Sequence, residues 1–129
     1  MIIRGINSWI TGTSLLFLFA ILSLTAHAAG QDAGAGKDVF AKRCTGCHAL
    51  DSEKEGPRLR GVLGRKAGTV PGFQYSDALR NSGIVWNESL LDKWLENPQG
   101  LVKDNNMEFH VANAGEREAL IAYLKSLAN

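Results

Sequence analysis

The spacing of apolar positions along the chain predicts helices separated by loops, with no convincing strand. Apolar residues recur at helical spacing in four stretches: 34–44, 76–83, 87–98 and 113–127. Asn87 stands where an N-cap belongs, and Pro98 stands where the same helix should end. From 49 to 75 the pattern is broken by repeated glycines and by prolines, which is typical of irregular loop. The sequence therefore predicts an all-α domain with much loop for its size.

The beginning of the chain differs from the rest. A basic residue near the start is followed by the apolar run 14–24 and by an A-x-A site that ends at Ala28. This order is typical of a secretory signal peptide, so we expect residues 1–28 to be removed and 29–129 to form the mature domain in the periplasm. The alternative is an uncleaved membrane anchor over 9–26, which is nearly long enough to span a bilayer.

Charge excludes one class of function. Cleavage would remove Arg4 from the 14 basic residues of the whole chain, which leaves 13 basic residues against 13 acidic ones. A neutral domain without a basic stripe gives no support to nucleic-acid binding. The mature length is that of one domain.

The chain has two cysteines, Cys44 and Cys47, and His48 follows the second directly. On a helix, residues at i, i+3 and i+4 share one face. C-x-x-C-H is the pattern of covalent c-type haem attachment, in which two thiols add to the vinyl groups and the imidazole becomes an axial iron ligand. A zinc site would need two more good ligands, a thioredoxin-like pair would need a βαβ pattern, and a structural disulfide would leave the histidine unexplained. A loop-rich helical domain also needs something large at its centre.

Beyond this motif, the mature chain resembles class I c-type cytochromes, the soluble monohaem family of mitochondria and bacteria, over nearly its whole length. The segments that carry the resemblance are GKDVFAKRCTGCH, GPRLRGVLGRKAG, PGFQYSDALRNSGIVW, LLDKWLENP and EREALIAYLKSL. It implies the all-α cytochrome c fold, with about four helices and long loops packed around one covalently bound haem. It also implies that the first and last helices cross, with Gly36 and Phe40 against Leu120 and Tyr123.

The resemblance assigns the cofactor and most of its surroundings. It implies one haem c per chain, attached through the two cysteines. The carbonyl of Pro57 would accept the second imidazole N–H of His48, which raises the basicity of that ligand. Arg65, Tyr75 and Trp86 match the positions that hold the haem propionates.

The sixth iron ligand implied by the resemblance is Met107, in the loop between the last two helices. The proline-glycine-threonine-lysine segment that precedes this methionine in the family is replaced by residues 103–106, and the usual tyrosine beside its sulfur is replaced by Trp94. A thioether opposite histidine favours reduced iron and suits an electron carrier. If Met107 leaves the iron, its place would go to Lys103, to His110 or to an open site.

The function expected from these residues is one-electron transfer by a monomeric carrier, not an enzyme, between a donor and an acceptor protein. The lysine ring through which the mitochondrial-type family docks is largely missing here, and only Arg43 keeps a charge at a comparable place. Docking should therefore not be strongly driven by lysines. An open sixth position would instead give a small-ligand binder or a weak peroxidase. A third hypothesis is an assembly domain that uses haem only as a structural core.

Overall fold

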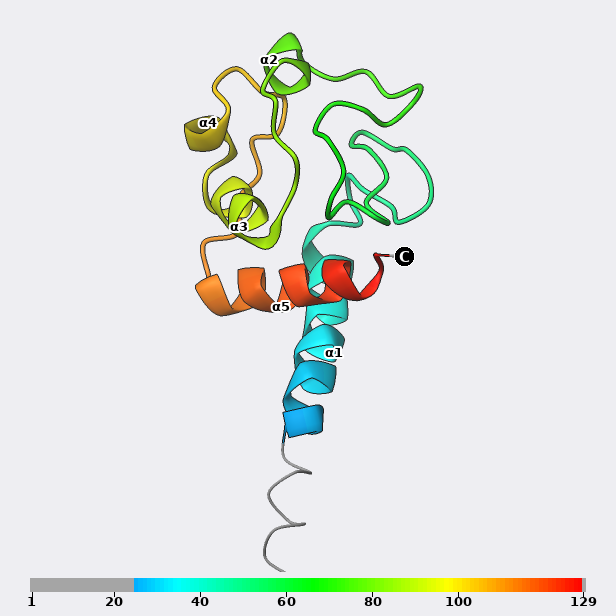
Figure 1. The fold of residues 1–129 in the computed structure, drawn as a ribbon, viewed down its shortest axis with the longest axis vertical. Helices are drawn as coiled ribbons and strands as arrows, with labels where there is room; N and C mark the ends of the chain where they lie inside the picture. Colours follow the sequence, from blue (N-terminus) through cyan, green and yellow to red (C-terminus); the bar gives the residue numbers. More distant parts are fainter. Residues whose placement is uncertain (1–24, 129) are drawn as a thin grey trace, which may run out of the picture.

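The computed structural model describes residues 25–128, which form helices and loops (Figure 1). The helices are α1 (Thr25–Arg43), α2 (Asp77–Arg80), α3 (Glu88–Glu96), α4 (Pro98–Leu101) and α5 (Ala114–Ser126). Within this range there is no strand, and the only bridge of β type joins Lys66 and Val85. The predicted all-α class is thus confirmed.

The observed helices follow the predicted stretches, with two differences. The first helix begins at Thr25 and ends at Arg43, so the expected cleavage point after Ala28 lies inside α1, whereas residues 1–24 of the expected signal peptide lie outside the described residues. Pro98 ends α3 as predicted, but it also opens the short helix α4, because proline is well suited to the first turn of a helix. None of the helices in the described part is long and apolar enough to cross a membrane.

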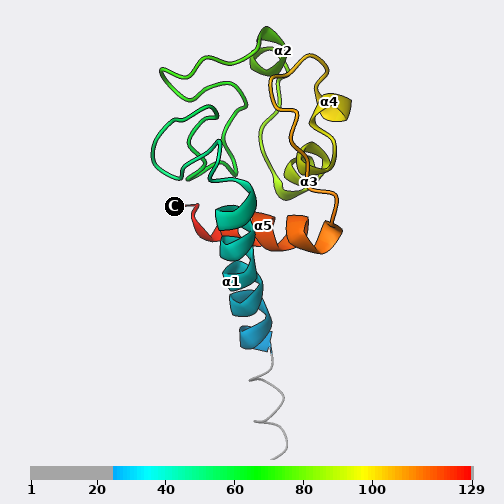
Figure 2. The ribbon, with the colours of Figure 1, turned by 180° about the vertical axis from the view of Figure 1, so that it is seen from behind.

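The first and last long helices cross, and α5 runs across α1 in both views of the ribbon (Figures 1 and 2). Gly36 makes this close approach possible, since a Cβ atom there would overlap the carbonyl of Ala119 and lie 2.7 Å from the Cβ of Tyr123. Next to it, the rings of Phe40 and Tyr123 are 5.7 Å apart, and Leu120 is only 1% exposed. The crossing implied by the family resemblance is confirmed.

The apolar core lies between α5, α3 and the long loops above α1. The amphipathic face of α3 supplies Leu91, Trp94 and Leu95, and the long loop supplies Val62 and other small apolar residues. Helix α3 begins at the predicted N-cap, Asn87, whose side chain accepts a hydrogen bond from the backbone N–H of Leu90 at 2.8 Å. The caps fix where each helix starts and so which face it turns inward.

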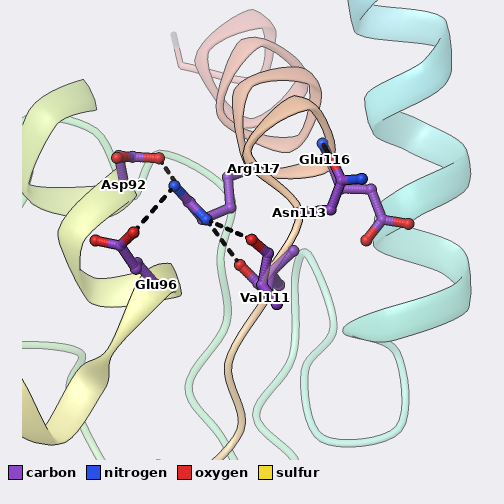
Figure 3. Close-up of polar contacts among 7 residues, drawn as sticks. Asp92, Glu96, Val111, Asn113, Glu116 and Arg117 are labelled. Atoms are coloured by element: carbon purple, nitrogen blue, oxygen red, sulfur yellow. Dashed lines mark hydrogen bonds and ion pairs between the residues drawn. The ribbon is translucent and has the colours of Figure 1, made fainter.

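A buried arginine ties α3 and α5 to the segment between them (Figure 3). Arg117, 6% exposed, donates through Nε to Asp92 at 2.7 Å and through Nη2 to Glu96 at 3.5 Å. Its Nη1 donates to the carbonyls of Val111 at 3.1 Å and Ala112 at 3.0 Å. The hydrogen bond to Asp92 raises the pKa of Arg117. This single side chain therefore fixes the segment that leads into α5.

The crossing predicts the effect of adding one methyl group to α1. We expect Gly36→Ala to lower the free energy of unfolding by about 1–3 kcal/mol, because the new Cβ must push α5 away. The matched control is Gly34→Ala, two residues earlier, where nothing lies within 4 Å of the added Cβ. That change should instead stabilise by up to about 1 kcal/mol, since alanine favours a helix over glycine. Urea unfolding of the haem-loaded variants measures both, and equal effects at the two positions would contradict the close crossing.

Candidate functional site

The cysteine–histidine motif forms a helical turn that continues the hydrogen bonding of α1. The backbone N–H of Cys44 donates to Phe40 at 2.9 Å, and those of Cys47 and His48 donate to the carbonyl of Cys44 at 3.1 and 2.8 Å. The regular helix ends one residue before the motif, at Arg43, but this turn keeps the i, i+3 and i+4 relation. The spacing predicts that the three side chains share one face of a helix; the regular helix ends before them, and its hydrogen bonding continues as a turn as far as His48.

The imidazole of His48 is held by backbone on the loop that follows. Its Nδ1 lies 2.8 Å from the carbonyl oxygen of Pro57, which can only accept, so Nδ1 carries the hydrogen. A Cβ at Gly56 would lie 2.5 Å from the same Nδ1, so only glycine fits between the loop and the ring. Burial lowers the pKa of His48, while the hydrogen bond to Pro57 opposes this shift. The neutral ring is left with Nε2 free of hydrogen, which is the state that binds a metal.

The two thiols differ in their surroundings. Both are free; Cys44 is half-buried and Cys47 is exposed. Burial raises the pKa of the Cys44 thiol to about 11, against the charge of the neighbouring Arg43. Among residues 25–128, no three His, Cys, Asp or Glu side chains gather closely enough to hold a metal ion by themselves.

The site has two walls, one formed by the cysteine–histidine turn and the other by the loop that carries Met107. On this second wall, Met107 is held by a tryptophan. The indole Nε1 of Trp94 donates to the sulfur of Met107, and the two atoms are 3.1 Å apart. Trp94 is buried and packs edge-on against Trp86, with ring centroids 5.4 Å apart. An indole N–H is a donor only, so the hydrogen bond leaves the thioether with a free lone pair.

Three adjoining cavities lie between these walls, and both His48 and Met107 line each of them. Their volumes are about 80, 130 and 290 Å³. The first is almost wholly apolar, and its other lining residues are Cys44, Leu59, Val62, Trp86, Leu91, Trp94, Leu95, Leu120 and Leu124. The largest is lined by both cysteines. An apolar space that joins two thiols, an imidazole and a thioether fits a haem in both size class and chemistry.

The residues expected at the polar end of the haem are placed less uniformly. Tyr75 lines the 130 Å³ cavity and Trp86 the apolar one, whereas Arg65 is not among the residues that line these three. Arg65 donates to two backbone carbonyls, those of Arg58 at 2.8 Å and Arg60 at 3.2 Å. Burial lowers the pKa of Arg65. Burial also raises the pKa of Tyr75, and the positive charge of Arg65 opposes this second shift.

Arg65 also differs from its neighbours in its ion pairs. Arg58 pairs with Glu53 and Arg60 with Asp51, but Arg65 has no carboxylate partner among the described residues. A half-buried guanidinium of this kind can accept an anion.

Sequence reasoning missed one buried residue of the site, Asn105. It is 6% exposed, and its Oδ1 accepts the backbone N–H of Met107 at 2.6 Å. The available signal was its place two residues before the methionine, because asparagine side chains often bond the backbone two residues on.

Comparison with known proteins agrees with this geometry. The family described as Cytochrome c matches residues 33–128. Cytochrome c2 of Blastochloris viridis is 40% identical over 112 residues, which cover 84% of this chain and 87% of that protein. Cytochrome c type-1 of Ascaris suum is 44% identical over 97 residues, which cover 73% of this chain and 87% of that protein.

Among solved structures, cytochrome cH from Methylobacterium extorquens superposes with a TM-score of 0.70 at 39% identity. The match covers 74% of this chain and 98% of the cytochrome cH chain. The chain therefore belongs to the cytochrome c family of electron carriers, which bind haem c covalently through cysteines, here Cys44 and Cys47.

Proposed function

We propose that His48 and Met107 are the two axial ligands of the haem iron, and that the chain carries one electron at a time between protein partners in the periplasm. The observation that carries this proposal is that both side chains line all three cavities of the site. Each is also fixed by a hydrogen bond, His48 through Nδ1 to Pro57 and Met107 through its sulfur from Trp94.

The bound haem supplies the one-electron chemistry, a cycle between ferrous and ferric iron. The residues of the chain set its conditions. By accepting the hydrogen bond from Nδ1, the Pro57 carbonyl raises the basicity of the imidazole of His48 as an iron ligand. The thioether of Met107 favours the reduced state and raises the potential. Because both side chains are held by the protein in advance, little needs to move when the charge changes.

The polar end is assigned by the same logic. Arg65, Tyr75 and Trp86 are proposed to hold the haem propionates, since Tyr75 and Trp86 line the site and Arg65 lacks a carboxylate partner among the described residues. Trp94 is proposed to keep the sulfur of Met107 in place. A labile Met107 would support the alternative function, a small-ligand binder or weak peroxidase.

The protein is proposed to act as a monomer. Its docking to redox partners is proposed to depend more on apolar contact than on charge. Phe109 is 45% exposed beside Met107 and lines the largest of the three cavities together with Cys47. The one charge that is kept from the family's lysine ring, on Arg43, is paired with Glu116 at 2.9 Å. Such a surface provides little electrostatic steering toward an acidic partner.

Export is proposed from the first 28 residues, with the mature domain beginning at Ala29. The support is the sequence pattern described above, a short apolar run followed by an A-x-A site. The family match begins at residue 33, after this segment.

Optical spectra of the haem-loaded protein test the ligand assignment. The ferric form should be low-spin with the weak sulfur-to-iron band, and carbon monoxide should leave the ferrous spectrum unchanged. Met107→Ala should lose the band and bind the gas, whereas Lys103→Ala and His110→Ala should behave as the unaltered protein. Gas binding by the unaltered protein would favour the small-ligand or peroxidase function instead.

Salt dependence tests the proposed docking. The rate at which membranes of the source cell oxidise the ferrous protein should change less than about threefold between about 10 and about 200 mM salt. A variant with lysines at two exposed positions, Asn106→Lys with Ala112→Lys, should acquire a steeper dependence if its partner is acidic. A steep fall for the unaltered protein would show that charge steers its docking.

The mass of the haem-loaded protein from the periplasmic fraction tests the processing site. We expect the mass of residues 29–129 plus one haem. Ala28→Leu, which spoils the A-x-A site, should leave the longer chain in the membrane fraction. Recovery of the unaltered chain at full length in membranes would instead indicate an anchor.

A further inference from the structure

The segment that leads to Met107 has its own hydrogen-bonded framework. In place of the family's proline-glycine-threonine-lysine, residues 103–106 are Lys-Asp-Asn-Asn. Asp104 has a φ of 63°, the only positive φ of a non-glycine residue in residues 25–128. A left-handed turn of this kind is costly for most residues and tolerable for aspartate. Contacts from two side-chain amides hold the backbone in this conformation.

One of these contacts is the buried amide of Asn105. Its Nδ2 donates to the carbonyl of Val102 at 2.7 Å, and its Oδ1 accepts the backbone N–H of Met107 at 2.6 Å. The side chain thus bridges the backbone on both sides of the turn. Because it is buried, water cannot easily replace either hydrogen bond.

The second contact is the amide of Gln99, on α4. Its Oε1 accepts the backbone N–H of Asp104 at 3.1 Å, and its Nε2 donates to the carbonyl of Asn105 at 2.9 Å. Gln99 therefore holds the backbone of the residue whose side chain holds Met107. Neither amide titrates, so the contacts do not depend on pH.

Beyond Met107 the next backbone anchor is four residues away. Val111 donates to the carbonyl of Leu95 at 2.7 Å and accepts from Arg117. Between them, residues 108–110 are exposed and make no backbone hydrogen bond within the described part of the chain. The backbone of Met107 is therefore held mainly from the N-terminal side, by Asn105.

We infer that Asn105 is the positioning residue for Met107, with Gln99 supporting it from α4. This inference rests on the proposed ligation of the iron by Met107. The loop before Met107 lacks the family's usual sequence, and the two amides hold its backbone instead. They fix the backbone of Met107 so that the sulfur stays at the site. An exogenous ligand must then displace a methionine that is already held in place.

Imidazole binding to the ferric, haem-loaded protein tests this inference. The apparent affinity for imidazole rises with the fraction of molecules in which Met107 has dissociated from the haem iron. Asn105→Ala removes the two hydrogen bonds that a buried side chain makes to the backbone, so we expect it to bind imidazole at least about tenfold more tightly than the unaltered protein. Gln99→Ala should give a smaller rise. In Asn105→Ser the hydroxyl can still accept a hydrogen bond from the backbone N–H two residues on. The rise in imidazole affinity should therefore be smaller than in Asn105→Ala.

Two controls separate positioning from general loss of stability. Asp104→Asn replaces a neighbouring exposed carboxylate that makes no side-chain hydrogen bond among residues 25–128, and Gly83→Ala strains a glycine whose φ is 70° and that lines none of the three cavities. Both should leave imidazole affinity within about twofold of the unaltered value. If Asn105→Ala does not take up haem, Gln99→Ala and Asn105→Ser carry the test.

The outcomes are distinct. Unchanged affinity in the Asn105 and Gln99 variants, in a protein that shows the sulfur-to-iron band, would overturn the positioning role alone. An equal rise in Asp104→Asn would overturn it too. Absence of the band from the unaltered protein would overturn both the proposed ligation and this inference.

Discussion

The close crossing of α1 and α5 at Gly36 is the contact on which the rest of the structure depends. Since α1 runs without interruption into the cysteine–histidine turn, the crossing point fixes where Cys44 and His48 lie relative to α5. Cys44 is eight residues beyond Gly36, about 12 Å along a helix. At the C-terminal end of α1, Arg43 forms an ion pair with Glu116 in the first turn of α5. This pair is a second contact that holds the two helices in their crossed arrangement. Helix α5 then reaches α3 through the buried Arg117.

The two walls of the site are built by different means. His48 is positioned by main chain: a carbonyl receives its Nδ1 hydrogen, and a glycine lets the loop lie against the ring. Met107 is positioned by side chains, the indole of Trp94 at its sulfur and the amide of Asn105 at its backbone N–H. A wall that depends on side chains can change by single substitutions. This is consistent with a chain that keeps the histidine motif of its family and departs from it around the methionine.

The haem also explains how so much loop can be ordered in a small domain. A haem bound at this site would bury the apolar side chains that line the 80 Å³ cavity, and burial of apolar surface is the main favourable term in folding. Leu59 and Val62 of the long loop face the site together with helical residues such as Leu120. The cofactor therefore belongs to the core as much as to the function.

The sequence by itself determined the helices, their caps and the attachment motif, because each of these is set by residues close together along the chain. Asn87 caps α3, and the turn from Cys44 to His48 follows from local hydrogen bonds. The family resemblance added the crossing at Gly36 and the pairing of His48 with Pro57, which spacing alone could not supply. Only the tertiary structure decided that Arg117 is buried and that Asn105 and Gln99 hold the turn before Met107. Arginine and asparagine are usually exposed, and whether such a side chain turns inward depends on backbone partners that the fold brings to it. Gln99 stays exposed, and its contacts too exist only because the fold brings the turn beside α4.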